Sequence, residues 1–266
     1  MRVALTIAGS DPSGGAGIQA DLKTFQAHGL FGMSAVTAVT VQNTRKVYDV
    51  QEIEPVIVHE QILRVFEDIA VDAVKIGMVS SIALIDSIAD ALGRVSLPPV
   101  VLDPVMISKS GYSLLRAEAR TALVERLFPL AEIVTPNIHE AELLAGFTIR
   151  TLPEMEAAAR QMVAAGAAKA VIKGGHLAGE AAVDLAYDGV RCETMTAPRI
   201  ATRNTHGTGC TFSSAVAANL ARGAAFFPAV AAAKQYITEA IRRAPDLGHG
   251  AGPLNHLVPV PSISPP

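Results

Sequence analysis

Residues 3–29 read VALTIAGSDPSGGAGIQADLKTFQAHG, and they predict a strand, a glycine-rich turn and a helix in that order. The apolar run 3–8 is typical of a buried strand of a parallel sheet. Apolar side chains then recur at helical spacing, at Ile18, Leu22 and Phe25. Gly29 follows as a helix terminator. We take this βα unit as the repeating element of the fold.

The same unit recurs along the chain, because short apolar runs alternate with helical patterns. Further strands are expected at 34–39, 73–76, 100–102, 132–135 and 170–173. Segments 182–187 and 191–196 flank Asp188-Gly189, a dipeptide suited to a tight hairpin turn. Helices are expected at 209–221 and 228–243. We find no linker, repeat or composition shift, so residues 1–266 are predicted to form one α/β domain with a central, mostly parallel sheet and an antiparallel edge hairpin.

Composition narrows the class of protein. Of 266 residues, 50% are apolar and 18% are charged, which disfavours disorder. The formal net charge is −3 and no dense basic run occurs, so nucleic acid is not an expected partner.

Cys192 and Cys210 lack metal or CxxC spacing, which suggests a reducing compartment. Asn219, Arg222 and Pro228 interrupt the most apolar long stretch. We expect a soluble cytoplasmic protein without a membrane span.

The strongest candidate for chemistry is residues 204–211, NTHGTGCT, which lead into a helix rich in small residues. Glycines let consecutive backbone amides converge, and with the positive end of the helix dipole they would stabilise a transferring phosphoryl group. Cys210 lies at this helix N-terminus, where a thiol is expected to have a lowered pKa and to act as a base or a nucleophile. The alternative is a glycine-rich loop in which a small cysteine only packs.

A second glycine-rich loop, residues 8–17, follows the first strand. It has neither the Lys-Ser/Thr ending of a Walker loop nor the spacing of a dinucleotide fingerprint, so we interpret it as a flexible wall around a small substrate. Asp21 lies on the same helical face as Ile18 and Phe25, which is unusual for a carboxylate without a polar partner. It either faces the site or only caps or braces the structure.

Oxygen ligands occur where other strands end. Asp103, Asn137 and Glu140 are of the kind that hold magnesium against nucleotide phosphates, although Asn137 with Glu140 also fits a helix capping box. Lys173, followed by two glycines, suits a nucleotide phosphate or is merely solvated. His139, His176 and His206 lack metal-ligand spacing and are interpreted as loop histidines. The absence of a GxSxG elbow disfavours a serine hydrolase.

With these segments the chain resembles the hydroxymethylpyrimidine/phosphomethylpyrimidine kinases of thiamine biosynthesis, within the ribokinase-like superfamily. The resemblance covers nearly the whole chain. The resemblance rests on these motifs: residues 8–23, Val41-Gln-Asn-Thr44, Lys75-Ile-Gly-Met78, Asp103-Pro-Val-Met106, Thr135-Pro-Asn137 with Glu140, Lys173-Gly-Gly-His176 and Asn204-Thr-His-Gly-Thr-Gly-Cys210.

The resemblance implies a three-layer sandwich, a homodimer and an ATP- and Mg²⁺-dependent kinase. The enzyme would phosphorylate 4-amino-5-hydroxymethyl-2-methylpyrimidine and then convert the monophosphate to the pyrophosphate. Its implied substrate residues are Gln42, which would hydrogen-bond the pyrimidine, with Gly9, Asp21 and Met78 around it. Its implied catalytic residues are Cys210 and the anion-hole residues Gly207, Thr208 and Gly209. Lys173, Asn137 and Thr205 would bind the nucleotide, and Asp103 and Glu140 the metal ion.

The catalytic base is open. Sugar and nucleoside kinases of this fold generally carry aspartate where this chain has Cys210, whereas the pyrimidine kinases and some pyridoxal kinases have cysteine. We hypothesise that Cys210 matters for the first transfer, in which an alcohol loses a proton, more than for the second, in which the acceptor is already anionic. Segments 10–17 and 109–112 are expected to be movable walls. Two alternatives remain: a pyridoxal or pyridoxine kinase, and a non-catalytic vitamin-binding protein. A dehydrogenase is disfavoured by the missing GxGxxG motif.

Overall fold

The computed structural model describes residues 1–108, 111–175, 177, 179 and 181–263. In this part of the chain the strands are β1 (Val3–Ser10), β2 (Phe31–Gln42), β3 (Val47–Glu52), β4 (Ala73–Ile76), β5 (Val100–Leu102), β6 (Ile133–Val134), β7 (Lys169–Ile172), β8 (Ala181–Tyr187) and β9 (Cys192–Pro198). The helices are α1 (Gly17–Ala27), α2 (Pro55–Asp68), α3 (Ile82–Gly93), α4 (Ala119–Leu127), α5 (Ile138–Ala145), α6 (Leu152–Ala164), α7 (Thr208–Ala221) and α8 (Phe226–Arg242), with a 3₁₀ turn η1 (Phe128–Leu130). None of these helices is long and apolar enough to cross a membrane.

All the described strands belong to one sheet, in the order β3-β2-β1-β4-β5-β6-β7-β8-β9. The six central strands, β2, β1, β4, β5, β6 and β7 in sheet order, are parallel to one another. Strand β3 pairs antiparallel at one edge, and β8 and β9 pair antiparallel at the other. After β1 the chain builds outward to β2 and β3, then returns to add β4 on the other side of β1. Such a reversal opens a crevice at the carboxyl ends of the strands, where ligands of open α/β sheets bind.

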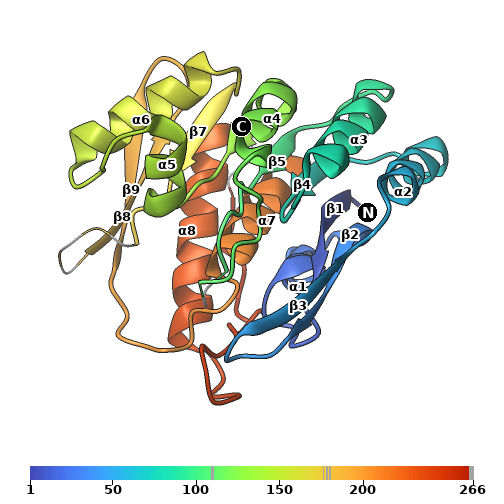
Figure 1. Ribbon diagram of the computed structural model, residues 1–266. Helices are drawn as coiled ribbons and strands as arrows, with labels where there is room; N and C mark the ends of the chain where they lie inside the picture. Colours follow the sequence, from blue (N-terminus) through green and yellow to red (C-terminus); the bar gives the residue numbers. More distant parts are fainter. Residues whose placement is uncertain (109–110, 176, 178, 180, 264–266) are drawn as a thin grey trace.

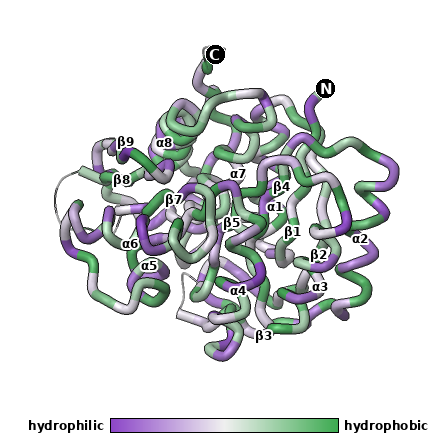
Figure 2. The backbone as a smooth tube through the Cα atoms, turned by 90° about the horizontal axis from the view of Figure 1, so that it is seen from above, coloured by the Kyte–Doolittle hydropathy of each residue, from purple (hydrophilic) through white to green (hydrophobic). Residues whose placement is uncertain are grey.

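The sheet lies between two layers of helices (Figure 1). Side chains alternate between its faces: Leu5 packs in one core with α2 to α6, whereas Ala4 packs in a second core with α7 and α8. The view from above shows α7 and α8 on one side of the strands and α3 to α6 on the other (Figure 2). The expected three-layer α/β sandwich is therefore confirmed.

The fold departs from the expectation at one edge. Strand β3 was not predicted from the sequence, and it pairs antiparallel with β2, so both edges of the sheet are antiparallel. Only Val47 of its sequence, VYDVQE, is buried, and no apolar alternation marks the segment, since a strand at a sheet edge contributes little to the core. The predicted hairpin between β8 and β9 is confirmed: the N–H of Asp188 donates to Arg191 across the turn, and Gly189 has φ of 96°.

Candidate active site

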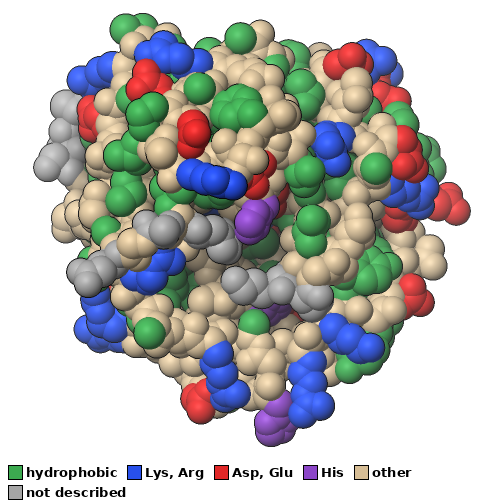
Figure 3. Space-filling view, turned by 60° about the vertical axis from the view of Figure 1, so that its left-hand side comes forward, with side chains coloured by type: hydrophobic (Ala, Val, Ile, Leu, Met, Phe, Trp, Pro, Cys, Tyr) green, Lys and Arg blue, Asp and Glu red, His purple; other side chains and the backbone are tan. Residues whose placement is uncertain are grey.

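A cavity of about 740 Å³ opens at the carboxyl ends of the parallel strands. In the space-filling view a hollow with charged side chains at its edge lies near the centre (Figure 3). Every candidate site residue except Asp21 lines this cavity: Gly9, Gln42, Met78, Asp103, Asn137, Glu140, Lys173, Thr205, Gly207, Thr208, Gly209 and Cys210. Residues that are far apart in the sequence are thus brought to one site, while their individual roles stay predictions.

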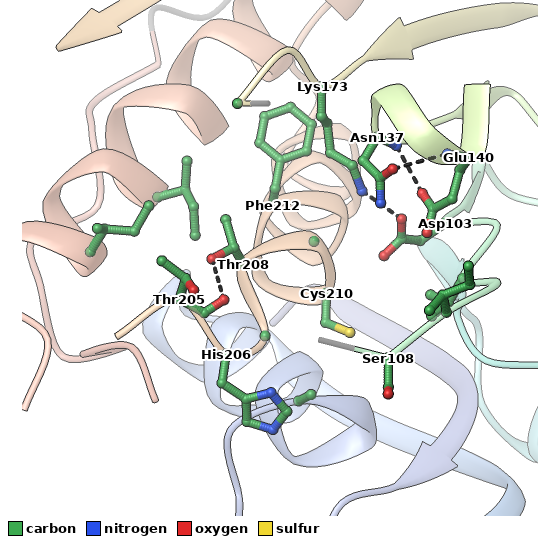
Figure 4. Close-up of a pocket in the computed structure, with 18 of the residues that line it drawn as sticks. Asp103, Ser108, Asn137, Glu140, Lys173, Thr205, His206, Thr208, Cys210 and Phe212 are labelled. Carbon is green, nitrogen blue, oxygen red and sulfur yellow. Dashed lines mark hydrogen bonds and ion pairs between the residues drawn. The ribbon is translucent and has the colours of Figure 1, made fainter. Parts of the chain in front are cut away.

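The turn before α7 is shaped by glycine. Gly207 is the N-cap residue with φ of 79°, and a Cβ there would lie 1.8 Å from the carbonyl oxygen of Gly15. The two glycine-rich loops therefore touch, and only glycine allows both the left-handed conformation and the close approach. The Thr208 hydroxyl donates to the carbonyl of Thr205 at 2.8 Å (Figure 4). The N-terminus of a 14-residue helix consequently opens on the cavity.

A lysine and two carboxylates lie beside this turn (Figure 4). The Lys173 Nζ donates to Asp103 Oδ1 at 2.7 Å, and a Cβ on Gly209 would lie 3.2 Å from the same nitrogen. Burial opposes the charge on Lys173, but Asp103 and Glu140 outweigh it and raise its pKa. Burial raises the pKa of Glu140 to about 7, with Asp103 adding to the effect and Lys173 opposing it. Lys173, Asp103 and Glu140 therefore form one cluster of interacting charges.

Asn137 and Glu140 also form a helix cap. The Asn137 side chain accepts from the Glu140 N–H at 3.0 Å, and the Glu140 carboxylate accepts from the Asn137 N–H at 2.8 Å. The capping-box interpretation is therefore confirmed, and it holds both side chains at the cavity wall.

The donor set at this point fits a magnesium ion that is only partly held by protein. Asp103 and Glu140 are buried carboxylates, and no group of three or more His, Cys, Asp or Glu side chains suited to a metal occurs among the described residues. Magnesium is commonly bound by one or two carboxylates and completes its shell with water and phosphate oxygens. The two carboxylates fit this kind of site.

Gly9, Gln42 and Met78 line the cavity where β1, β2 and β4 end, away from β7 in the strand order. A Cβ on Gly9 would lie 3.1 Å from the Met78 sulfur, so the strand backbone lies against this thioether. The Gln42 amide lies 3.3 Å from His206 Nε2 and accepts a hydrogen bond from Thr40 at 3.2 Å. An amide held in this way at a cavity wall can present a donor and an acceptor to a heteroaromatic ring.

His206 is more than the loop histidine that we expected. Its Nε2 lies 2.7 Å from Asp11 Oδ2, and both side chains are buried. Although burial raises the pKa of Asp11, hydrogen bonds from His206 and Ser13 lower it to about 2. The pair connects the first glycine-rich loop with the turn before α7. Spacing in the sequence contains no signal for it, because the partners are 195 positions apart.

The structure describes only part of what was predicted for His139, His176 and segment 109–112. His139 lies at the cavity but is largely exposed, with 67% of its side chain accessible. His176 lies outside the described residues. Of the expected movable segment 109–112, Lys109 and Ser110 also lie outside them.

Asp21 does not line the cavity, which corrects the expectation that it would contact the substrate. It is fully buried behind the cavity wall, where it accepts hydrogen bonds from Thr6 at 2.6 Å and Ser214 at 2.7 Å. Lys75 Nζ donates to both of its carboxylate oxygens, at 3.0 and 2.9 Å. These buried hydrogen bonds fit the bracing alternative.

The expected lowering of the Cys210 pKa is also wrong. Burial raises the pKa of this thiol to about 11, and the charges of Asp21 and Asp103 add to the effect. Lys75 and the N–H of Gly17 act in the opposite direction without overcoming it. The helix N-terminus alone is therefore a poor guide to this thiol, whose pKa is raised rather than lowered.

Sequence reasoning missed an apolar slot that extends the cavity beyond Lys173. One face of α8 lines it, at Lys234, Ile237, Thr238 and Ile241, and strand β9 contributes Ala197 and Pro198. A buried pair, Lys234 with Asp184 at 2.8 Å, also lines it, and Asp184 accepts a further hydrogen bond from the N–H of Gly174. The i, i+3, i+4, i+7 spacing on α8 is a signal for a shared face, but not for what that face contacts.

Comparisons with known proteins identify the family. A family model described as phosphomethylpyrimidine kinase matches residues 11–255. The hydroxymethylpyrimidine/phosphomethylpyrimidine kinase of Rhizobium meliloti (strain 1021) is 51% identical over 257 residues, covering 96% of each chain. The thiamine biosynthesis bifunctional protein ThiED of Geobacter sulfurreducens is 50% identical over 254 residues, which are 96% of this chain and 52% of that protein, so the chain spans about half its length.

Among solved structures, an ADP complex of Bacillus subtilis pyridoxal kinase has a TM-score of 0.90 at 43% identity and covers 96% of this chain and 97% of that one. The fold and the phosphotransferase class expected from the sequence are thus confirmed. Because the family model spans most of the chain and a full-length relative is half identical, the protein belongs to the phosphomethylpyrimidine kinase family.

Proposed function

We propose that the protein transfers the γ-phosphoryl group of ATP to the hydroxymethyl group of 4-amino-5-hydroxymethyl-2-methylpyrimidine. It then phosphorylates the monophosphate to the pyrophosphate, as a cytoplasmic enzyme of thiamine biosynthesis. The observation that carries the proposal is the order of groups along one cavity. Gln42 ends β2 and contacts His206 of the turn before α7, whereas Lys173 and Asp103, which follow β7 and β5 on the other side of β1, lie next to Gly209 of the same turn.

The nucleotide would occupy the part of the cavity that includes Lys173 and the apolar slot. A buried slot lined by Ile237 and Ala197 suits a purine ring, and Lys173 suits the phosphates that follow it. The similarity to a kinase solved with ADP supports a nucleotide site in this cavity. Asn137 and Thr205 flank the same region and would contact the phosphates.

Mg²⁺ would be held by Asp103 and Glu140, and when bound it would neutralise charge on the phosphates. The remaining steps belong to the protein. Gln42 orients the ring so that its hydroxymethyl oxygen points toward the turn before α7. The amides of that turn, with the helix dipole, stabilise the charge spread over the transferring group. For the second transfer the acceptor is the phosphate of the monophosphate, placed at the same turn.

We also propose that residues 1–266 act as one kinase domain and assemble as a homodimer. The continuous sheet from β3 to β9 supports the single domain. Light scattering during size-exclusion chromatography tests the dimer, and a monomer mass at micromolar concentration would contradict it.

A product assay tests the proposed function. Purified protein with ATP and Mg²⁺ receives the hydroxymethylpyrimidine, its monophosphate and pyridoxal in separate reactions. We expect ADP and the pyrophosphate ester from the monophosphate. Gln42→Ala is expected to raise the KM for the pyrimidine while the KM for ATP stays within about twofold, because Gln42 contacts only the acceptor end.

Pyridoxal kinase is the second candidate, favoured by the similarity to the Bacillus subtilis enzyme. Cys210 lies in the cavity wall, where a thiol could add to the aldehyde of pyridoxal. Turnover of pyridoxal alone, together with protection of Cys210 from alkylation by pyridoxal, would move the assignment to this vitamin. Turnover of the pyrimidine monophosphate alone would exclude it.

A further inference from the structure

A buried ion pair lies directly behind the cavity wall and has no part in the scheme above. Lys75 on β4 and Asp21 on α1 are both fully buried, yet Lys75 belongs to the cavity wall and Asp21 does not. The cation therefore lies on the cavity side of the carboxylate. Replacing a buried ion pair by apolar residues is often neutral or stabilising, so fold stability alone is a weak reason for this arrangement.

The sheet register and the helix period place this pair beneath Cys210. Thr6 and Lys75 are register partners on the parallel strands β1 and β4, so their side chains share one face of the sheet. Helices α1 and α7 cover that face, and Ser214 of α7 donates to Asp21 at 2.7 Å. Cys210 precedes Ser214 by four residues on the same helix, hence it lies one turn away on the same side.

Lys75 has little freedom to move. It donates to both oxygens of Asp21, and a Cβ on Gly77 would lie 2.6 Å from its Nζ. Burial opposes its charge, but Asp21 outweighs burial and holds the pKa of Lys75 above the ordinary value. A permanent positive charge is thus fixed at one point of the cavity wall.

We propose that Lys75 is a positioning residue whose fixed charge stabilises the thiolate of Cys210, and that Asp21 limits this effect by offsetting part of that charge. The inference rests on the proposed function. In the first transfer the hydroxyl O–H bond breaks as the oxygen bonds the γ-phosphorus and the bond to ADP breaks. Only where Cys210 is a thiolate can its Sγ take up this proton, and the resulting thiol later releases it to water in the cavity.

Four charged groups act on Cys210 from the elements around it. Lys75 on β4 and Lys173 after β7 favour the thiolate, whereas Asp21 on α1 and Asp103 after β5 oppose it. Lys173 is engaged by Asp103 at 2.7 Å. Of the two partners in the buried pair, Lys75 acts on the thiol more strongly than Asp21 does, which agrees with its place on the cavity side.

The test is the rate of Cys210 alkylation by iodoacetamide as a function of pH, without substrates, in a Cys192→Ser background. Cys210 is partly exposed and so open to the reagent. Lys75→Met is expected to slow alkylation at fixed pH by about tenfold, since one pKa unit is a tenfold change in thiolate. Asp21→Asn, which is isosteric, is expected to speed it by a similar factor. Simple loosening of the packing would expose the thiol and speed the reaction in both variants.

A matched control is available in the second buried pair. The double variant Asp184→Asn, Lys234→Met removes a second buried ion pair that lines the same cavity, and it is expected to leave Cys210 alkylation unchanged. If Lys75→Met does not fold, the neutral double variant Asp21→Asn, Lys75→Met replaces it and is expected to react more slowly than the parent.

Faster alkylation in both single variants, or an unchanged pH midpoint, would overturn the proposal. So would a neutral double variant that reacts as fast as the parent. The assay uses no substrate, so its outcome is separate from the proposed function. A protein that failed to phosphorylate the pyrimidine would refute the function and leave the thiol measurement standing.

Discussion

Two buried histidines, His28 and His256, make the stability of this protein sensitive to acid. His28 packs edge-on against Tyr236 with ring centroids 4.7 Å apart, and the Thr211 hydroxyl lies 3.0 Å from His256 Nε2. Burial lowers the pKa of each histidine to about 4. For His28 the Thr24 carbonyl partly opposes burial, and Arg222 adds to it.

The sign of the effect follows from where the proton binds first. Above the unfolded pKa of about 6.5 neither state carries the proton, so folding is unaffected. As the pH falls through 6.5 the unfolded chain takes up the proton and the folded chain does not, so stability is lost until the folded pKa near 4 is reached. The shift of 2.5 units is worth about 3 kcal/mol for each histidine over that whole interval.

The perturbation is His28→Phe, which keeps a ring against Tyr236 and removes the titrating group. It also removes the hydrogen bond to the Thr24 carbonyl, which costs about 1 kcal/mol at neutral pH. Urea unfolding at several pH values between about 7 and 4.5 gives the free energy of unfolding of both proteins. We expect the parent to lose about 2.5 kcal/mol more than the variant over this range.

Comparing the two proteins removes the contributions of other groups, such as Glu140, whose raised pKa acts with the opposite sign. Parallel curves of unfolding free energy against pH for parent and variant would refute the reasoning. They would mean that His28 is protonated in the folded protein despite its burial.

Three further predictions concern the site. Gly207→Ala is expected to lower kcat by more than about a hundredfold, because its Cβ would lie 1.8 Å from the Gly15 oxygen. Gly223 is also at positive φ but has open space around it, so Gly223→Ala should keep activity. Equal losses in the two variants would contradict the steric argument. The apparent affinity for Mg²⁺ should fall as the pH is lowered through about 7, where Glu140 takes up a proton, and Glu140→Gln should abolish this dependence in KM measurements for Mg²⁺. Cys210→Ala should slow the first transfer at least about tenfold more than the second in separate kcat measurements, and an equal loss on both would leave Cys210 only an anion-hole or structural role.

The strands, the turns and the location of the site could be predicted from the sequence because their signals are local. Apolar runs mark the buried strands, glycine marks the turns after them, and parallel strands place their carboxyl ends at one edge. For this reason Lys173, Asp103 and Gln42 were expected near one another, and they line one cavity. The edge strand β3 was missed because exposed residues contain no such pattern.

Tertiary structure decided the electrostatics. The Lys75–Asp21 pair is completed by Thr6 and Ser214, so its parts come from β1, α1, β4 and α7. The pKa of Cys210 is raised, against expectation, because burial and the distances to charges on other elements outweigh the local helix N-terminus. Burial and charge separation depend on which elements pack together, and residues far apart in the sequence meet only when the sheet and its two helical layers have formed.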